Sequence, residues 1–125
     1  MSVNKAILVG RVGGAPDVAT IGGSPAAKFR MVTSKRWKGD DGEWKEKAEW
    51  HSVVWWGDAA SRLPEYVCKG SLVYVEGEIN YRESEKDGVT RHFTDIKAFT
   101  VRRLGGKRPG DEEKAAEAGG EDLPF

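Results

Sequence analysis

Five β-type segments separated by glycine turns fill most of this chain, and one segment of another kind lies between the third and the fourth. Alternation of apolar with polar residues predicts strands at residues 3–12, 27–37, 43–56, 72–81 and 90–101. In the intervening segment, Asp58 can cap a helical stretch and Gly70 can end it. Because proline suits a first helical turn, Pro64 predicts a short helix over residues 64–69.

This order of three strands, one helix and two strands matches the OB-fold, a five-stranded Greek-key barrel. With 125 residues, the chain has room for one hydrophobic core. We therefore expect an all-β OB-fold domain over residues 1–104. The barrel face of OB-folds binds oligonucleotides or oligosaccharides, and the fold alone does not decide between them.

The C-terminal part of the chain differs from the barrel in composition and in charge. From Gly105 onward the sequence consists mainly of Gly, Pro, Lys, Glu and Ala, so residues 105–120 are expected to form a disordered linker. Residues 1–108 hold 19 basic and 14 acidic residues, whereas residues 109–125 hold one Lys and six acidic residues. The formal net charge of zero thus combines an anion-binding body with an acidic tail.

All five tryptophans lie between residues 37 and 56, in a stretch that is also dense in Lys and Arg. Strand alternation places Trp50 and Trp56 on one face of the third strand and Trp55 on the opposite face. One face can then belong to the core while the other stacks on bases. The rings alone fit a core equally well, and the charges alone fit a solvated surface. Their combination favours a nucleic-acid site.

Other chemistries find little support in the residues. Cys68 is the only cysteine, which excludes an intrachain disulfide and a cysteine cluster for a metal, and we expect no metal or cofactor. The apolar run at residues 6–9 is too short for a signal peptide or a membrane span, so we expect a cytoplasmic protein without a membrane partner. Residues 10–14 lack the Gly-Lys-Ser/Thr of a P-loop, and Glu49 beside His51 has no third catalytic partner. We therefore expect no enzyme.

Three internal segments and the C-terminus carry a resemblance to a known family. The segments are residues 3–10 (VNKAILVG), 49–57 (EWHSVVWWG) and 66–77 (YVCKGSLVYVEG), and the chain ends in EDLPF. They resemble the bacterial single-stranded DNA-binding protein family, whose acidic tail tip usually closes in Ile-Pro-Phe. The short linker fits a phage-borne or plasmid-borne member as well as a chromosomal one.

The resemblance implies a nucleoid-associated homotetramer that wraps single-stranded DNA without sequence preference in replication, recombination and repair. By position, it places base-stacking aromatics at Trp37, Trp50 and Trp56, while Ser84 stands where the family has a fourth stacking Trp. The phosphate contacts are expected from Lys5, Arg11, Lys35, Arg36, Lys38, Lys69 and Arg82. The tip at residues 121–125 is expected to recruit replication, recombination and repair proteins through Asp122, Leu123, Pro124 and Phe125.

Two other functions remain open from the residues alone. One is an RNA-binding OB module, and the other is an interaction adaptor that acts through its tail. An RNA module does not need the acidic Leu-Pro-Phe ending, and an adaptor does not need the cluster of Trp and Lys. The presence of both features favours a single-strand binder that also recruits proteins.

Overall fold

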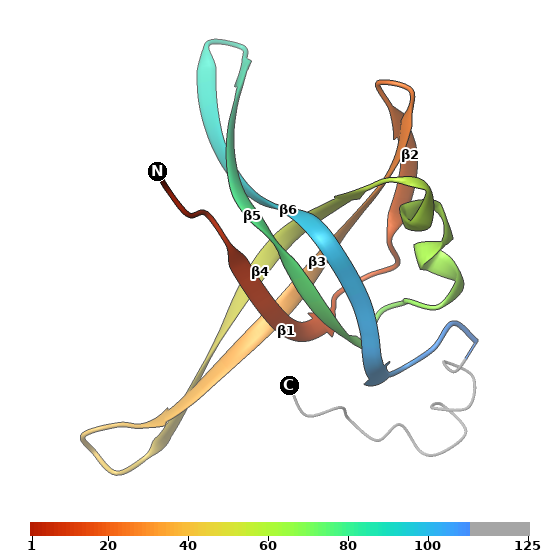
Figure 1. Cartoon of the computed structure of the whole chain (residues 1–125). Helices are drawn as coiled ribbons and strands as arrows, with labels where there is room; N and C mark the ends of the chain where they lie inside the picture. The colour runs from red at the N-terminus through yellow and green to blue at the C-terminus, as the bar shows by residue number, and fades with distance from the viewer. Residues whose placement is uncertain (111–125) are drawn as a thin grey trace.

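Six strands and one short helix make up the part of the chain that the computed structural model describes, residues 1–110 (Figure 1). In chain order the elements are β1 (Ala6–Val12), β2 (Asp17–Ile21), β3 (Ser24–Lys38), β4 (Trp44–Trp56), the 3-10 helix η1 (Asp58–Glu65), β5 (Ser71–Lys86) and β6 (Val89–Gly106).

Five of these strands close into a barrel. The order of hydrogen-bonded neighbours is β1-β5-β6-β4-β3-β2, and an additional pairing of β1 with β3 completes the closure. Neighbouring strands are antiparallel except β4 and β6, which run parallel from Ser52 opposite Asp95 to Trp55 opposite Ala98. The predicted all-β OB-fold, with a helix between the third and fourth barrel strands, is confirmed.

The core lies inside the barrel and under η1. Phe29 and Met31 of β3 and Val53 of β4 point inward from alternate positions, as the pleat of a strand requires. The helix contacts β2, β3 and β4, and it buries Ala60 and Leu63 completely. These two residues are three apart, which places them on one side of a 3-10 helix.

The helix differs from the prediction of residues 64–69. It begins at Asp58, and Pro64 lies in its last turn. The N-terminal cap position belongs to Gly57 without any side-chain cap, so Asp58 does not cap it. The carbonyl of Leu63 closes the turn after Glu65. It accepts hydrogen bonds from the backbone N–H groups of the two residues that follow Glu65. The helix thus lies mostly before the proline, where Ala60 and Leu63, three residues apart, are both buried against the barrel.

Strand β2 was not predicted from the sequence. All five of its residues are exposed, so no in-and-out alternation marks it. It pairs with β3 from Asp17 opposite Lys28 to Ile21 opposite Ser24. Gly22 and Gly23 join the two strands with φ values of 61° and 84°, the positive values that a tight hairpin turn favours.

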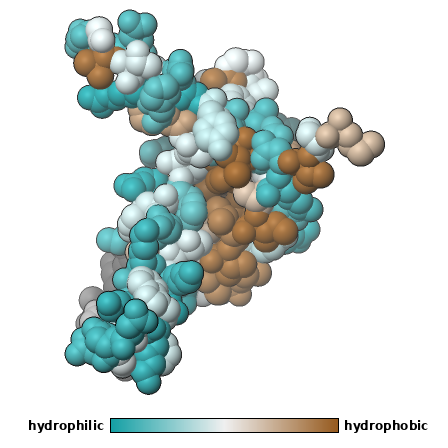
Figure 2. Space-filling view, turned by 90° about the vertical axis from the view of Figure 1, so that its left-hand side faces the viewer, coloured by the Kyte–Doolittle hydropathy of each residue, from teal (hydrophilic) through white to brown (hydrophobic). Residues whose placement is uncertain are grey.

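Two hairpins extend beyond the barrel as long arms. The β3–β4 arm closes at Lys38 opposite Trp44, and the β5–β6 arm closes at Lys86 opposite Val89. Figure 1 shows them projecting from opposite ends of the molecule, and Figure 2 shows mainly hydrophilic side chains on both. Strands β5 and β6 are therefore longer than predicted, and β6 runs to Gly106. The rest of the predicted linker from residue 111, and the predicted tip, lie outside the described residues.

Candidate nucleic-acid interface

Three hollows that share lining residues lie along one face of β4, and together we call them the groove. Its middle part has a volume of about 420 Å³ and is bordered by Trp50, Arg30 and Arg82. A second part of about 600 Å³ shares Arg82 and reaches Trp56. A third part of about 580 Å³ shares Trp50 and reaches Lys69. The groove thus leads from Lys69 past Trp50 to Trp56, and all six strands contribute residues to its lining.

The indole of Trp50 stands at the junction of two parts of the groove and is 51% exposed. Gly13 leaves the room that the ring needs, because a Cβ there would lie 2.3 Å from the Cζ3 atom of Trp50. The Gly13 N–H donates a hydrogen bond of 2.8 Å to the carbonyl of Arg30, and the Arg30 guanidinium lies 4.9 Å from the centre of the Trp50 ring. An exposed aromatic surface with a cation beside it suits a base and its phosphate.

Trp56 lies on the same face of β4 as Trp50, and Trp55 lies on the opposite face. Trp56 is 38% exposed and borders the groove together with Lys28 and Lys97. Trp55 is partly buried and packs against the core. The structure therefore has the alternation that the sequence predicts for this strand.

The predicted DNA-binding residues of the β3–β4 arm lie on both of its faces. The register is regular, so Trp37 opposite Lys45 lies on the face that continues from Val53, away from the groove face. Lys35 shares that side with Trp37, whereas Arg36 and Lys38 lie on the groove side. Trp37 is 39% exposed. The structure thus does not bring Trp37 and Trp50 onto one face of the arm.

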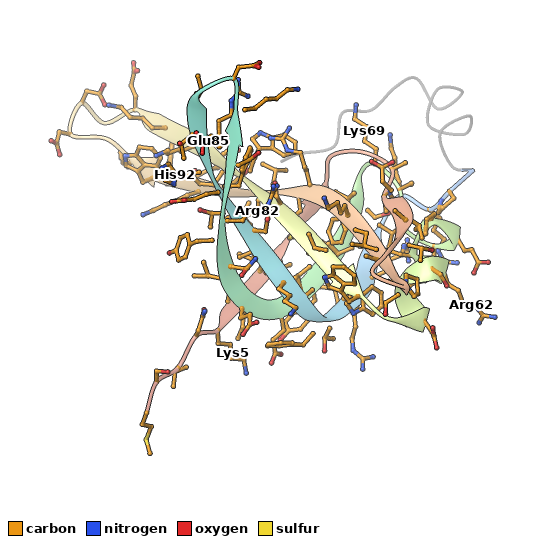
Figure 3. All side chains as sticks on the ribbon, turned by 90° about the horizontal axis from the view of Figure 1, so that it is seen from above. Lys5, Arg62, Lys69, Arg82, Glu85 and His92 are labelled. Atoms are coloured by element: carbon orange, nitrogen blue, oxygen red, sulfur yellow. The ribbon has the colours of Figure 1, made fainter. Side chains whose placement is uncertain are left out.

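The other predicted cations occupy different surroundings. Lys69 borders the groove, and Arg82 borders it while pairing with Asp95 and lying 4.3 Å from the centre of the Phe93 ring. Arg11 donates a hydrogen bond of 3.2 Å to the carbonyl of Gly70. Lys5 does not border any part of the groove, and Figure 3 shows it on the opposite side of the molecule from Lys69.

Lys5 instead has an acidic partner on β5. Its Nζ atom lies 2.8 Å from Oε1 of Glu76, whose Oε2 accepts a hydrogen bond of 2.8 Å from the Tyr74 hydroxyl. The hydrogen bond with Glu76 raises the pKa of Lys5, and the same contacts lower the pKa of Glu76. The hydrogen bond to Glu76 also raises the pKa of Tyr74. The positive charge of Lys5 is therefore already balanced within the protein.

Comparison with known proteins identifies the family once this geometry is known. Residues 3–104 match the single-strand binding protein family. The chain belongs to this family. Curated relatives include the single-stranded DNA-binding proteins of Xanthomonas axonopodis pv. citri (41% identical over 110 residues, 86% of this chain and 61% of the relative) and Neisseria meningitidis serogroup B (38% over 109 residues, 86% and 63%). The chain thus spans less than two thirds of the length of these relatives.

Solved structures of family members have the same fold. An SSB from Plasmodium falciparum in complex with ssDNA is 30% identical, with a TM-score of 0.77 over 84% of this chain and 97% of that chain. A deletion mutant of the single-stranded DNA binding protein from Thermus aquaticus is 25% identical, with a TM-score of 0.73 over 84% of this chain and 52% of that chain.

Several groove residues of this family member escaped the sequence analysis. Lys28 and Arg30 of β3 face the groove opposite Val54 and Ser52 of β4. Their alternation with buried Phe29 and Met31 marks an outward face, but only the strand pairing shows that this face is shared with Trp50. Three more, on β5 and β6, come into place only when the barrel closes: Asn80, Asp95 and Lys97.

Three further observations concern residues 1–110. No helix in this part of the chain is long and apolar enough to cross a membrane. Among the same residues, no three His, Cys, Asp or Glu side chains are grouped so that they could hold a metal ion. Cys68 is buried, and its backbone N–H donates a hydrogen bond of 3.0 Å to Oγ of Ser71.

Proposed function

We propose that this protein binds single-stranded DNA without sequence preference in the groove along β4, as a binding protein and not as an enzyme. The observation that carries the proposal is the exposed Trp50, held by Gly13 and Arg30 in a groove that also contains Trp56. Membership of the single-strand binding protein family and the fold shared with the Plasmodium SSB support it.

Stacking and charge have separate tasks in this account. Unpaired bases stack on the exposed indoles, which accept any base because every base has a π-face, at ~1–3 kcal/mol per base. Lys28, Lys69 and Lys97 border the groove and contact phosphates. The bases of a duplex are already stacked on each other, so duplex DNA offers the indoles little to bind.

The homotetramer implied by the family resemblance has support in β1. Residues 6–10 of β1 pair with β5 on one side, whereas pairing with β3 is confined to Arg11 and Val12. Ile7 and Val9, on this strand, are 57% and 49% exposed, and a band of hydrophobic side chains crosses the barrel in Figure 2. An open strand edge beside exposed apolar side chains suits association with a second copy.

The cellular role is proposed on the same basis. In the cytoplasm, near the nucleoid, the tetramer protects single strands during replication, recombination and repair. The acidic tip, with Asp122, Leu123, Pro124 and Phe125, recruits other proteins of these processes. Phe125 supplies an aromatic anchor, and Pro124 restrains the backbone so that less entropy is lost on docking.

Parallel titrations with three nucleic acids test DNA binding. Tryptophan fluorescence is followed while oligo-dT, duplex DNA or RNA of matched length is added at about 0.15 M salt, where exposed charges are substantially screened. We expect quenching by oligo-dT at much lower concentration than by duplex. Equal affinity for duplex and single strand would refute the proposal, and a clear preference for RNA would favour an RNA-binding module.

Removal of Leu123, Pro124 and Phe125 tests recruitment separately. The shortened chain should retain its affinity for oligo-dT, because the groove lies in residues 1–110. It should lose the proteins that the full chain captures from a bacterial lysate. Capture of the same proteins by both chains would show that the tip does not dock partners.

A further inference from the structure

Strand β4 carries three tryptophans on one face at equal intervals. Trp44, Trp50 and Trp56 are six residues apart, and the register with β3 is regular along the whole pairing. Because side chains alternate with a period of two, all three project to the groove side. Each lies about 20 Å from the next along the strand. Their exposed fractions rise toward the tip of the arm, from 38% at Trp56 to 51% at Trp50 and 65% at Trp44.

The contact between arginine and indole that occurs at Trp50 is repeated at Trp44. The Arg36 guanidinium lies 5.4 Å from the centre of the Trp44 ring, and that of Arg30 lies 4.9 Å from the Trp50 ring. In both cases the arginine is on β3, opposite the residue two positions after the tryptophan on β4. The same diagonal pair thus occurs twice along one ribbon, once in the groove and once on the arm.

The core does not account for Trp44. Residues 34–38 of β3 and 44–50 of β4 are all exposed, so this part of the arm contains no buried side chain. A large indole that is 65% exposed has no role in core packing there, and it presents a flat apolar surface with the Arg36 guanidinium over the ring.

We propose that Trp44 is a base-stacking residue that extends the path of single-stranded DNA from the groove onto the β3–β4 arm. This inference rests on the proposed function of the groove. Residues 34–49 hold five basic and five acidic residues, so the arm attracts DNA little by net charge. Stacking on Trp44, with Arg36 close to the adjoining phosphate, then supplies the contact.

Three consequences follow for a Trp44→Ala variant. Its affinity for oligo-dT long enough to reach the arm should fall about 5- to 150-fold, the usual effect of losing one stacking ring. Its affinity for oligonucleotides that fill only the groove should remain unchanged. The slope of log affinity against log salt should become shallower by no more than about 0.7, the value of one phosphate contact, because Arg36 is the one cation that the proposal places beside a phosphate on the arm.

The test is fluorescence anisotropy of labelled oligo-dT with the full chain, over lengths from about 4 to about 16 nucleotides, the range of site sizes for one OB-fold. Trp44→Phe, which keeps a ring, should retain most of the affinity. The matched control is Tyr81→Ala. Tyr81 is 76% exposed on the β5–β6 arm, but its position opposite Thr94 places it on the face of that arm that does not border the groove. Circular dichroism confirms that each variant is folded.

The outcomes distinguish this inference from the proposed function. A length-dependent loss in Trp44→Ala, absent in Tyr81→Ala, supports a stacking role. If Trp44→Ala binds every length as tightly as the parent chain, or if Tyr81→Ala loses as much, the inference is wrong while the groove proposal stands. If the parent chain itself fails to bind oligo-dT, the proposed function is wrong and this inference falls with it.

Discussion

The tryptophans of β4 show how position in a strand decides the use of identical side chains. Trp55 and Trp56 are adjacent, yet Trp55 packs against the core and Trp56 borders the groove. This difference could be predicted from the sequence, because the period of a strand does not depend on its partners. The support that Gly13 gives to Trp50 could not be predicted, since it depends on how closely the segment after β1 approaches β4.

Two alanine substitutions separate these uses. Trp50→Ala should weaken oligo-dT binding by ~1–3 kcal/mol, because one stacking ring is lost. Trp55→Ala should instead lower the free energy of unfolding, by less than the ~3–5 kcal/mol typical of a fully buried ring, since Trp55 is only partly buried. Urea denaturation and anisotropy titrations of both variants are the measurements. The assignment fails if folded Trp50→Ala binds oligo-dT as tightly as the parent chain.

At the scale of elements, the alternation in the sequence predicted the strands that have one buried face. It did not predict the strand that has no buried face. The barrel strands alternate because one face meets the core, whereas β2 is exposed on both faces and pairs only with β3. Pro64 places the helix too late because proline favours a first helical turn, whereas in η1 it lies in the last turn. The burial of Ala60 and Leu63 determines the position of η1, and that burial depends on the barrel beneath it.

The lengths of the arms have a related cause. Beyond the barrel, β5 and β6 pair only with each other, so the alternation that marks the core fades after Ile79 while the hairpin continues to Lys86. Positive φ values of 55° at Asp87 and 77° at Gly88 close it in the manner of a two-residue hairpin turn. A glycine turn thus lies between residues 81 and 90, as the sequence predicts, although the two strands that it joins are longer than predicted.

At the scale of the whole molecule, the groove is a product of barrel closure. Lys97 reaches Val54 only through the parallel pairing of β6 with β4, and Arg82 reaches the same groove from β5. Such long-range pairing leaves no local signal in the sequence. Trp50, Trp56, Lys69 and Arg82 of the groove are among the residues predicted from the sequence, whereas Lys28, Arg30 and Lys97 required the closed barrel.

The central claim is that the groove face of β4 holds single-stranded DNA while the opposite face belongs to the core. The most direct measurement is an NMR titration of the indole N–H signals with oligo-dT, because the chain has five tryptophans and each gives one such signal. The account predicts large changes for Trp50 and Trp56 and the smallest change for Trp55. Changes at Trp55 with constant signals from Trp50 and Trp56 would contradict it.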